Sequence, residues 1–172
     1  MSSRKPNAPK SLALGLDLSL GSGIDSCPIS RVRLRRVLLA SLSASKKPLR
    51  HGAMINLRLC DAKEAKALNR AHRSKAYAPN VLTFEYPTLP GQALQADIAI
   101  CIPVVQKEAR QQGKTLEHHF VHLLVHGSLH ALGFDHLDNS QAEVMESLER
   151  KILKRFRISD PYLLHSPDDR LG

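Results

Sequence analysis

Alternating and helical runs of apolar residues divide the chain into interleaved strands and helices. Leucine stands at every second position over 12–20, and apolar residues alternate with polar ones over 55–59. A period of two is typical of half-buried strands. Two further strands are predicted at 81–86 and 96–101, where a connection containing proline and glycine separates them.

Capping residues mark the first two predicted helices. Ser30 could cap a helix over 31–44, in which apolar side chains recur three and four residues apart. Asp61 and Glu64 resemble a capping box, a pair of side chains that satisfy the free backbone N–H groups at a helix start. This pair predicts a second helix that runs through about His72.

Similar signals bound two helices in the second half of the chain. Pro103 suits the first turn of a helix that ends at Gly113. Ser140 and Glu143 resemble a second capping box before a helix near 141–156. The spacing of its apolar residues predicts that five side chains point inward: Val144, Met145, Leu148, Ile152 and Phe156.

Strands interleaved with helices predict an α+β fold with one small, mixed, four-stranded sheet packed against about five helices. The length of 172 residues suits a single core. Residues 1–11 are polar and contain proline, so we expect a disordered basic arm there. The single domain is expected over 12–165, followed by a flexible tail over 166–172.

Composition favours a cytoplasmic protein without a membrane partner. No apolar run approaches the roughly 20 residues that span a bilayer. Asp17 interrupts the apolar segment near the N-terminus, which favours a strand over a signal peptide. Cys27, Cys60 and Cys101 are odd in number and widely spaced, which predicts reduced thiols rather than disulfides.

The charge of the chain suggests a polyanionic partner. Lysine and arginine number 25 against 16 acidic residues, which gives a net charge of +9. Such an excess attracts RNA, ribosomes or anionic membranes, although it can also be a solvated basic surface. The chain has no tryptophan, three tyrosines and four phenylalanines. Few bases could stack on so few aromatic rings, so phosphate contacts should dominate any RNA binding.

The segment HGSLHALGFDH carries the strongest chemical signal. On a helix predicted over 116–132, His126 and His130 lie four residues apart and therefore project from one face. Gly133 can end the helix in a left-handed conformation, after which the chain can bring His136 back to the same point. Three imidazoles with a fourth position open to water are typical of catalytic zinc sites.

Two other interpretations of this segment must be weighed. His118, His119 and His122 lie just upstream, so the histidines could simply be surface or core residues of a histidine-rich helix. The ligand spacing is also that of the metzincin proteases, HExxHxxGxxH. Gly127 stands where those proteases carry the glutamate that activates water. Its absence argues against peptide hydrolysis.

HGSLHALGFDH resembles the signature of the YbeY family, bacterial endoribonucleases that mature ribosomal RNA. LNRAHRSKAYAPNVLTFEYP at 68–87 is similar to the family's arginine loop and following strand. ADIAIC at 96–101 resembles the next family strand, and the segments 142–153 and 160–162 resemble the C-terminal helix and its close. These similarities occur in the family's order over about 55–162.

The resemblance implies one zinc ion per chain. Its ligands would be His126, His130 and His136. The functional arginine of the family aligns with Arg73 in a polar loop, so Arg73 and the metal-bound His126 are the expected catalytic residues. His122, one helical turn before His126, could line the same cleft or be a packing residue.

The chain departs from the usual family pattern at a few positions. Pro79 replaces a threonine, Thr83 replaces a serine, Ala96 replaces a glycine and Ala131 replaces a leucine. None of these changes removes an expected metal ligand. The altered loop at 75–80 affects only the detailed path expected for RNA.

The resemblance implies a single-strand-specific, metal-dependent endoribonuclease that acts in 16S rRNA 3′ end maturation and ribosome quality control. Expected partners are ribosomal RNA and the small ribosomal subunit, with ribosomal proteins or an assembly GTPase as further candidates, and no DNA. The alternative is a zinc-containing ribosome-assembly factor that binds RNA without cutting it.

Two catalytic routes stay open for the enzyme. Zinc lowers the pKa of bound water and polarises a phosphoryl oxygen, so either hydroxide or the adjacent 2′-OH could attack phosphorus. Arg73 is suited to the developing negative charge. Asp97 and Asp135 could orient an imidazole N–H, or they could be ordinary strand and turn residues.

Overall fold

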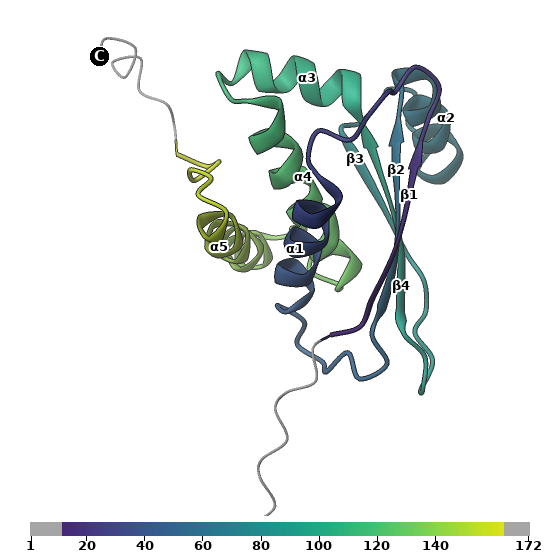
Figure 1. Ribbon diagram of the computed structural model, residues 1–172, viewed down its shortest axis with the longest axis vertical. Coiled ribbons are helices and arrows are strands. Elements are labelled where there is room, and N and C mark those ends of the chain that lie inside the picture. Colours follow the sequence, from purple (N-terminus) through teal and green to yellow (C-terminus); the bar gives the residue numbers. More distant parts are fainter. Residues whose placement is uncertain (1–11, 164–172) are drawn as a thin grey trace, which may run out of the picture.

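A mixed four-stranded sheet lies at the centre of the computed structural model, which describes residues 12–163 (Figure 1). The strands are β1 (Leu14–Leu20), β2 (Ala53–Cys60), β3 (Val81–Glu85) and β4 (Leu94–Cys101). Their order is β1-β2-β4-β3; β1, β2 and β4 are parallel, and β3 runs antiparallel to β4 at one edge. The predicted mixed sheet is therefore confirmed.

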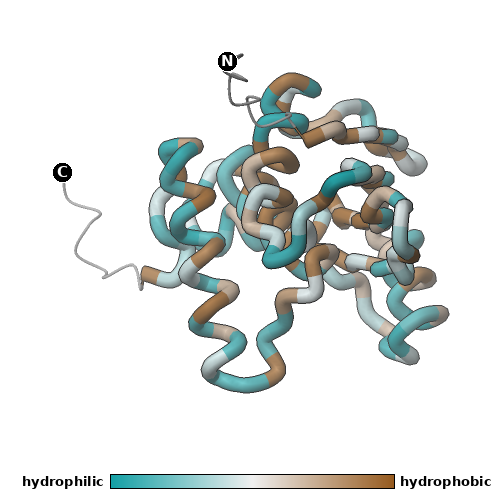
Figure 2. The backbone as a smooth tube through the Cα atoms, turned by 90° about the horizontal axis from the view of Figure 1, so that it is seen from below, coloured by the Kyte–Doolittle hydropathy of each residue, from teal (hydrophilic) through white to brown (hydrophobic). Residues whose placement is uncertain are grey.

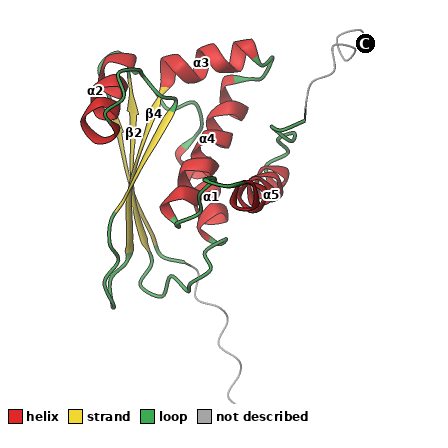
Figure 3. Ribbon diagram, turned by 180° about the vertical axis from the view of Figure 1, so that it is seen from behind, coloured by secondary structure: helices red, strands yellow, loops and turns green. Residues whose placement is uncertain are grey.

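Five helices pack around this sheet in the described residues. They are α1 (Arg31–Leu42), α2 (Ala62–Arg73), α3 (Ile102–Gln111), α4 (Leu116–Ala131) and α5 (Asn139–Arg155). Figures 1 and 3 show α1, α4 and α5 on one side of the sheet and α2 on the other. The α+β prediction with about five helices is confirmed, and the histidine segment lies on the central helix, α4.

Two predicted segments lie outside the described residues, namely the disordered basic arm over 1–11 and the tail over 166–172. The domain boundaries at 12 and 165 therefore stay predictions. Within the part of the chain that the structure describes, no helix is long and apolar enough to cross a membrane.

The hydrophobic core fills the space between the sheet and helices α1 and α4. Along β2, Ile55, Leu57 and Leu59 all face this side and are fully or almost fully buried, as their period of two predicted. Phe120 and Leu124 of α4 are fully buried against them. Each such side chain stabilises the fold by about 1.5–3 kcal/mol. Figure 2 shows hydrophobic segments gathered in the middle of the fold.

A smaller cluster lies on the other face of the sheet, under α2. Cys60 and Cys101 are paired in register on β2 and β4, and both are buried with Ala65 of α2. Their thiols are free, as is that of the half-buried Cys27. The prediction of unpaired cysteines is confirmed.

The first two helices begin where the capping residues predicted. The Ser30 hydroxyl accepts a hydrogen bond from the Arg33 N–H at the start of α1, and the Asp61 carboxylate accepts one from the Glu64 N–H at the start of α2. The second half of the predicted capping box is wrong. The Glu64 carboxylate turns to Arg58, at 2.8 and 3.1 Å, because an ion pair is available there.

The predicted capping box of α5 is also wrong. The helix begins at Asn139, before Ser140, and the carboxylate of Asp138 caps it by accepting from the Gln141 N–H at 2.8 Å. Val144, which was expected inside, is 46% exposed. The buried face of α5 consists of Met145, Glu149, Ile152 and Leu153. Met145 and Ile152 are buried as predicted, and Leu148 and Phe156 are partly buried against the core. The prediction missed Glu149, because buried glutamates are rare.

Candidate metal centre

Helix α4 and the turn after it bring three histidines together. His126 and His130 share one face of the helix, and Gly133 ends it with a φ of +82°. The Phe134 N–H donates to the Leu129 carbonyl at 3.1 Å across this turn. The reversed chain then returns His136 to the same point, as the sequence predicted.

The three imidazoles have the spacing of a metal site. One ring nitrogen from each of His126, His130 and His136 lies within 4.8 Å of the others. The Nε2 atoms of His126 and His130 are 3.1 Å apart. Two nitrogens bound to one tetrahedral zinc would lie about 3.3 Å apart. These residues can therefore hold a metal ion.

Gly127 follows the first of these histidines because the helix packs tightly on the sheet there. A Cβ at this position would lie 3.1 Å from the Thr83 Oγ1, 3.2 Å from the Ile98 Cγ2 and 3.3 Å from the Val81 Cγ2. These distances are shorter than ordinary van der Waals contact. A glutamate at Gly127 would therefore have no room for its side chain, and it would point at the sheet.

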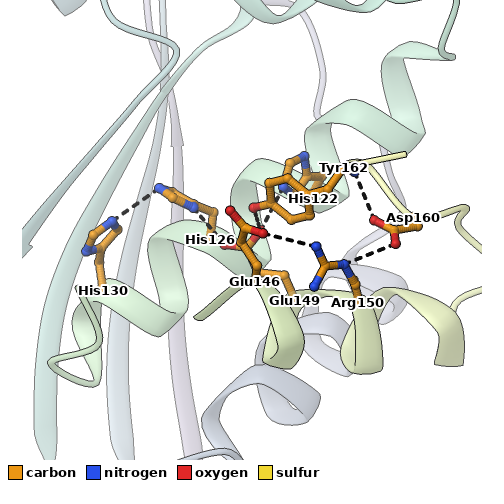
Figure 4. A network of polar contacts seen from close by, with 8 residues as sticks. All are labelled: His122, His126, His130, Glu146, Glu149, Arg150, Asp160 and Tyr162. Carbon is orange, nitrogen blue, oxygen red and sulfur yellow. Dashed lines mark hydrogen bonds and ion pairs between the residues drawn. The ribbon is translucent and has the colours of Figure 1, made fainter. Parts of the chain in front are cut away.

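A buried glutamate on α5 contacts the histidines on the side away from the cleft. The sequence analysis did not predict a role for this residue. Glu149 Oε1 lies 2.7 Å from the His126 Nδ1, and its Oε2 lies 2.9 Å from the His122 Nε2 (Figure 4). The Tyr162 hydroxyl also donates to this carboxylate. His122 was predicted as a possible cleft residue; it instead contacts the carboxylate that holds His126.

The charge of Glu149 fixes the proton on His126. Burial alone would raise the pKa of the Glu149 carboxyl, but hydrogen bonds from His122 and His126 lower it to about 2. An ionised carboxylate can only accept hydrogen bonds, so the His126 Nδ1 carries the proton. The lone pair of this imidazole is then on Nε2, the atom that faces His130 and suits a metal ligand.

His130 is likewise held in the form that binds metals. Burial lowers the pKa of His130, and the neighbouring imidazoles of His126 and His136 lower it further, to about 4. Its ring is therefore neutral near pH 7, with one nitrogen free of a proton. Metal binding requires this neutral form.

The chain after α5 closes over Glu149. The Arg150 guanidinium contacts the Asp160 carboxylate at 3.0 Å and the Glu146 carboxylate at 3.0 Å. It also lies 5.0 Å from the centre of the Tyr162 ring. Figure 4 shows these side chains in a continuous network that leads to His126. The segment after α5 thus positions a hydroxyl that contacts the buried carboxylate.

The three histidines open onto a cleft with a volume of about 760 Å³. Arg73 lines the same cleft. It was predicted in a loop, but it is the last residue of α2, and Ser74 ends the helix with a left-handed φ of 56°. The Asn69 amide holds the next loop by donating to the Tyr77 carbonyl at 3.0 Å. The expected metal ligands and the expected arginine thus face one space.

A second carboxylate forms part of the cleft wall. Glu108 of α3 accepts from the Asn80 amide at 3.1 and 3.2 Å, and it lies 2.7 Å from the His119 Nε2. His119 is only 3% exposed, and burial lowers its pKa. His119 is therefore a core residue whose Nε2 pairs with Glu108, one of the two ordinary roles considered for the upstream histidines.

The two aspartates considered as supports for an imidazole have other partners. Asp97 accepts from the Asn56 amide at 2.7 Å and the Tyr86 hydroxyl at 2.6 Å. Of the two roles left open for Asp97, these contacts favour the ordinary strand residue, because its side chain lies on the sheet face opposite α4. Asp135 accepts from the backbone N–H of His136 at 2.8 Å and shapes the turn that carries this histidine.

Comparison with known proteins gives consistent matches over most of the chain. A family model described as "Endoribonuclease YbeY" matches residues 25–157. A protein of that name from Thiobacillus denitrificans is 50% identical over 149 residues, which cover 87% of this chain and 96% of the relative. One from Bordetella pertussis is 45% identical over 155 residues, 88% of this chain and 99% of the relative.

A solved structure also matches the fold. The solution structure of a Thermotoga maritima protein is 24% identical, with a TM-score of 0.50. The match covers 87% of this chain and 99% of that one. At this level of identity the likeness supports the fold alone.

Proposed function

The chain belongs to the endoribonuclease YbeY family, and we propose on this basis that it is a metal-dependent endoribonuclease that cuts single-stranded RNA in ribosomal RNA maturation. Its proposed target is the 3′ end of 16S rRNA on the small ribosomal subunit, with ribosome quality control as part of the same role. One observation carries the proposal: three convergent histidines and Arg73 line one cleft. A metal ion and a guanidinium in one cleft can bind two oxygens of one phosphodiester.

The proposed metal is one zinc ion per chain, held by His126, His130 and His136. The donor set supports this choice, because three neutral imidazole nitrogens suit zinc and leave a fourth position open. When bound, zinc supplies a Lewis acid and an activated water. Glu149 is proposed to accept a hydrogen bond from the His126 Nδ1–H, which keeps the proton on Nδ1 and leaves Nε2 free to bind the ion.

Arg73 is proposed to bind the phosphate that is cut. Its planar guanidinium can donate two parallel hydrogen bonds to phosphate oxygens, which a lysine cannot do. No described ion pair holds its side chain to an acidic residue, so its donors are available to a ligand. Its place at the end of a helix that Ser74 closes fixes its backbone relative to the cleft.

A second candidate function is a ribosome-assembly factor that binds RNA without cutting it. The packing at Gly127 favours this candidate, because it removes the glutamate that related metal sites use as a base. An enzyme without that glutamate needs another proton acceptor, or the 2′-OH of RNA as the attacking group.

The test separates binding from cutting. Zinc-loaded protein, metal-free protein, His130→Ala and Arg73→Ala are incubated with a single-stranded RNA under single-turnover conditions, and binding is titrated in parallel. The enzyme is supported if only the zinc-loaded parent cuts and Arg73→Ala still binds. The assembly-factor role is supported if the zinc-loaded parent binds RNA but is not itself the source of any cleavage. Cleavage that persists in both His130→Ala and Arg73→Ala would come from a contaminating nuclease.

A further inference from the structure

Helix α2 presents a row of four basic side chains, of which only the last has a role in the proposed active site. Lys63, Lys66, Arg70 and Arg73 are three, four and three residues apart, and all are exposed. At about 100° per residue they fall within an arc of about 80° on one side of the helix. We call these four residues the α2 basic stripe. Among the described residues, none of the four has a side-chain ion pair.

The acidic residues of α2 do not neutralise the stripe. Asp61 is used as the helix cap, and the Glu64 carboxylate is bound to Arg58. Ala65 and Asn69 are the residues that face the protein interior. The exposed side of the helix therefore carries these positive charges without a free acidic side chain beside them.

The stability of the helix explains the presence of two of the four basic residues. Arg70 and Arg73 lie in the last turn, where a positive charge stabilises the helix by interacting with its dipole. Lys63 lies in the first turn, where a positive charge is unfavourable for the same reason. Its position, and that of Lys66 on the same side, therefore needs another explanation, such as an anionic ligand.

The stripe leads directly to the cleft. From Lys63 to Arg73 the helix rises by about 15 Å, and Arg73 lines the cleft together with His126 and His130. A stacked strand rises by about 3.4 Å per nucleotide along its axis, so a strand aligned with the helix would pass about four nucleotides over this length.

We infer that Lys63, Lys66 and Arg70 of the α2 basic stripe bind phosphates of the RNA strand outside the scissile bond and guide that strand toward Arg73 and the cleft. This inference rests on the proposed endoribonuclease function. The other exposed residues of α2 are His72 and the alanines at 62, 67 and 71, so this helix offers little apolar surface to a protein or a membrane. A row of charges without apolar anchors suits a polyanion, which it binds with release of counterions.

The test compares two triple variants with the same change in net charge. The stripe variant is Lys63→Gln/Lys66→Gln/Arg70→Gln, and it leaves Arg73 in place. The control is Lys151→Gln/Lys154→Gln/Arg155→Gln, which removes three exposed charges from α5. Zinc-loaded proteins are titrated with a single-stranded RNA of about 12 nucleotides, long enough to cover stripe and cleft, at several salt concentrations. Melting curves check that both variants fold.

The stripe variant should bind this RNA at least about 10-fold more weakly than the parent at low salt, and the control should lose far less. The slope of log affinity against log salt should fall by about 2, or 0.7 for each of three lost phosphate contacts. Lys63→Gln alone should lower it by about 0.7. Cleavage of a fragment of only two or three nucleotides should be unchanged in the stripe variant.

The results that would overturn the inference are distinct from those that would overturn the proposed function. If the parent cleaves RNA and the stripe variant matches the α5 control in affinity and salt slope, the stripe is only a solvated surface. If the stripe variant also loses cleavage of the short fragment, the change acts through Arg73 and a separate binding surface is excluded. A zinc-loaded parent that neither binds nor cuts any RNA overturns both proposals.

Discussion

Glu149 of α5 and His126 of α4 are joined by a 2.7 Å hydrogen bond that is completely hidden from solvent on the carboxylate side. This bond connects two helices, fixes the proton of an imidazole and leaves its other nitrogen in the cleft. It links the packing of the C-terminal helix to the chemistry that we propose for the metal centre.

Glu149→Gln should weaken metal binding by about 10- to 100-fold, because the neutral amide no longer favours the proton on the His126 Nδ1. The measurement is zinc affinity by chelator competition, together with the absorption spectrum of the cobalt-substituted protein. Glu146→Gln is the matched control, since this half-buried residue of the same helix has Arg150 as its one ion-pair partner among the described residues. Equal zinc affinity in parent and Glu149→Gln would show that the bond does not position the ligand.

Removal of metal should lower the melting temperature, because a ligand that binds only the folded state stabilises it. At free zinc 100-fold above the Kd, the gain is about 2.7 kcal/mol. His130→Ala should melt at the same temperature with and without zinc. Elemental analysis that finds no zinc in the purified parent, and none taken up after addition, would contradict the assignment of the three histidines.

Arg73→Lys should reduce single-turnover cleavage by about 100-fold or more, because the lysine keeps the charge but loses the paired donors. Zinc content and melting temperature should change little, since Arg73 is exposed and is not a ligand. Arg70→Lys, on the same side of the same helix, is the control and should cut RNA like the parent. Loss of RNA binding and cleavage to the same extent would make Arg73 an anchor rather than a catalytic residue.

Gly127→Ala should destabilise the fold by about 1–3 kcal/mol, because the added methyl group must displace side chains of β3 and β4. Gly127→Glu should be more damaging and should not create a protease-like base. Denaturant unfolding gives the free energy of unfolding for each variant. A Gly127→Ala protein as stable as the parent would show that the sheet yields easily at this contact.

The metal-free protein should lose stability as the pH falls from about 6.5. The pKa of His130 is lowered from 6.5 to about 4 on folding. Between these pH values the unfolded chain binds more protons than the native state, so the free energy of unfolding decreases as the pH falls. Glu149, whose pKa is lowered from 4.5 to about 2, acts in the same direction at lower pH. Melting temperatures from pH 7 to pH 3 test this, and Glu149→Gln should flatten the profile below pH 4.5. A rise in stability on acidification would contradict both pKa shifts.

The sequence predicted the convergence of the histidines because the evidence for it is local. Residues four apart on a helix, followed by a glycine stop, determine where His126, His130 and His136 must lie. Arg73 could be paired with them only through family resemblance, since the distance between α2 and α4 depends on the strand order, which no local pattern encodes.

Glu149 was missed for a physical reason. Patterns of apolar residues assign charged side chains to the surface, and a fully buried glutamate contradicts that rule. A signal was nevertheless present: Glu149 is four residues after Met145 and three before Ile152, so it lies on the apolar side of its helix. A carboxylate on the apolar side of a helix implies a buried hydrogen-bonding partner, and the histidines of α4 could have been proposed as that partner.

The hydrogen bonds to Glu149 also have a consequence for the order in which the site is completed during protein synthesis. During translation, His126, His130 and His136 are added to the chain before Glu149, and Tyr162 is added after Glu149. A nascent chain therefore exposes three histidines before the groups that orient them exist. The hydrogen bonds that orient the proposed metal ligands are therefore complete only after α5 and the segment beyond it have been synthesised and have folded back onto α4.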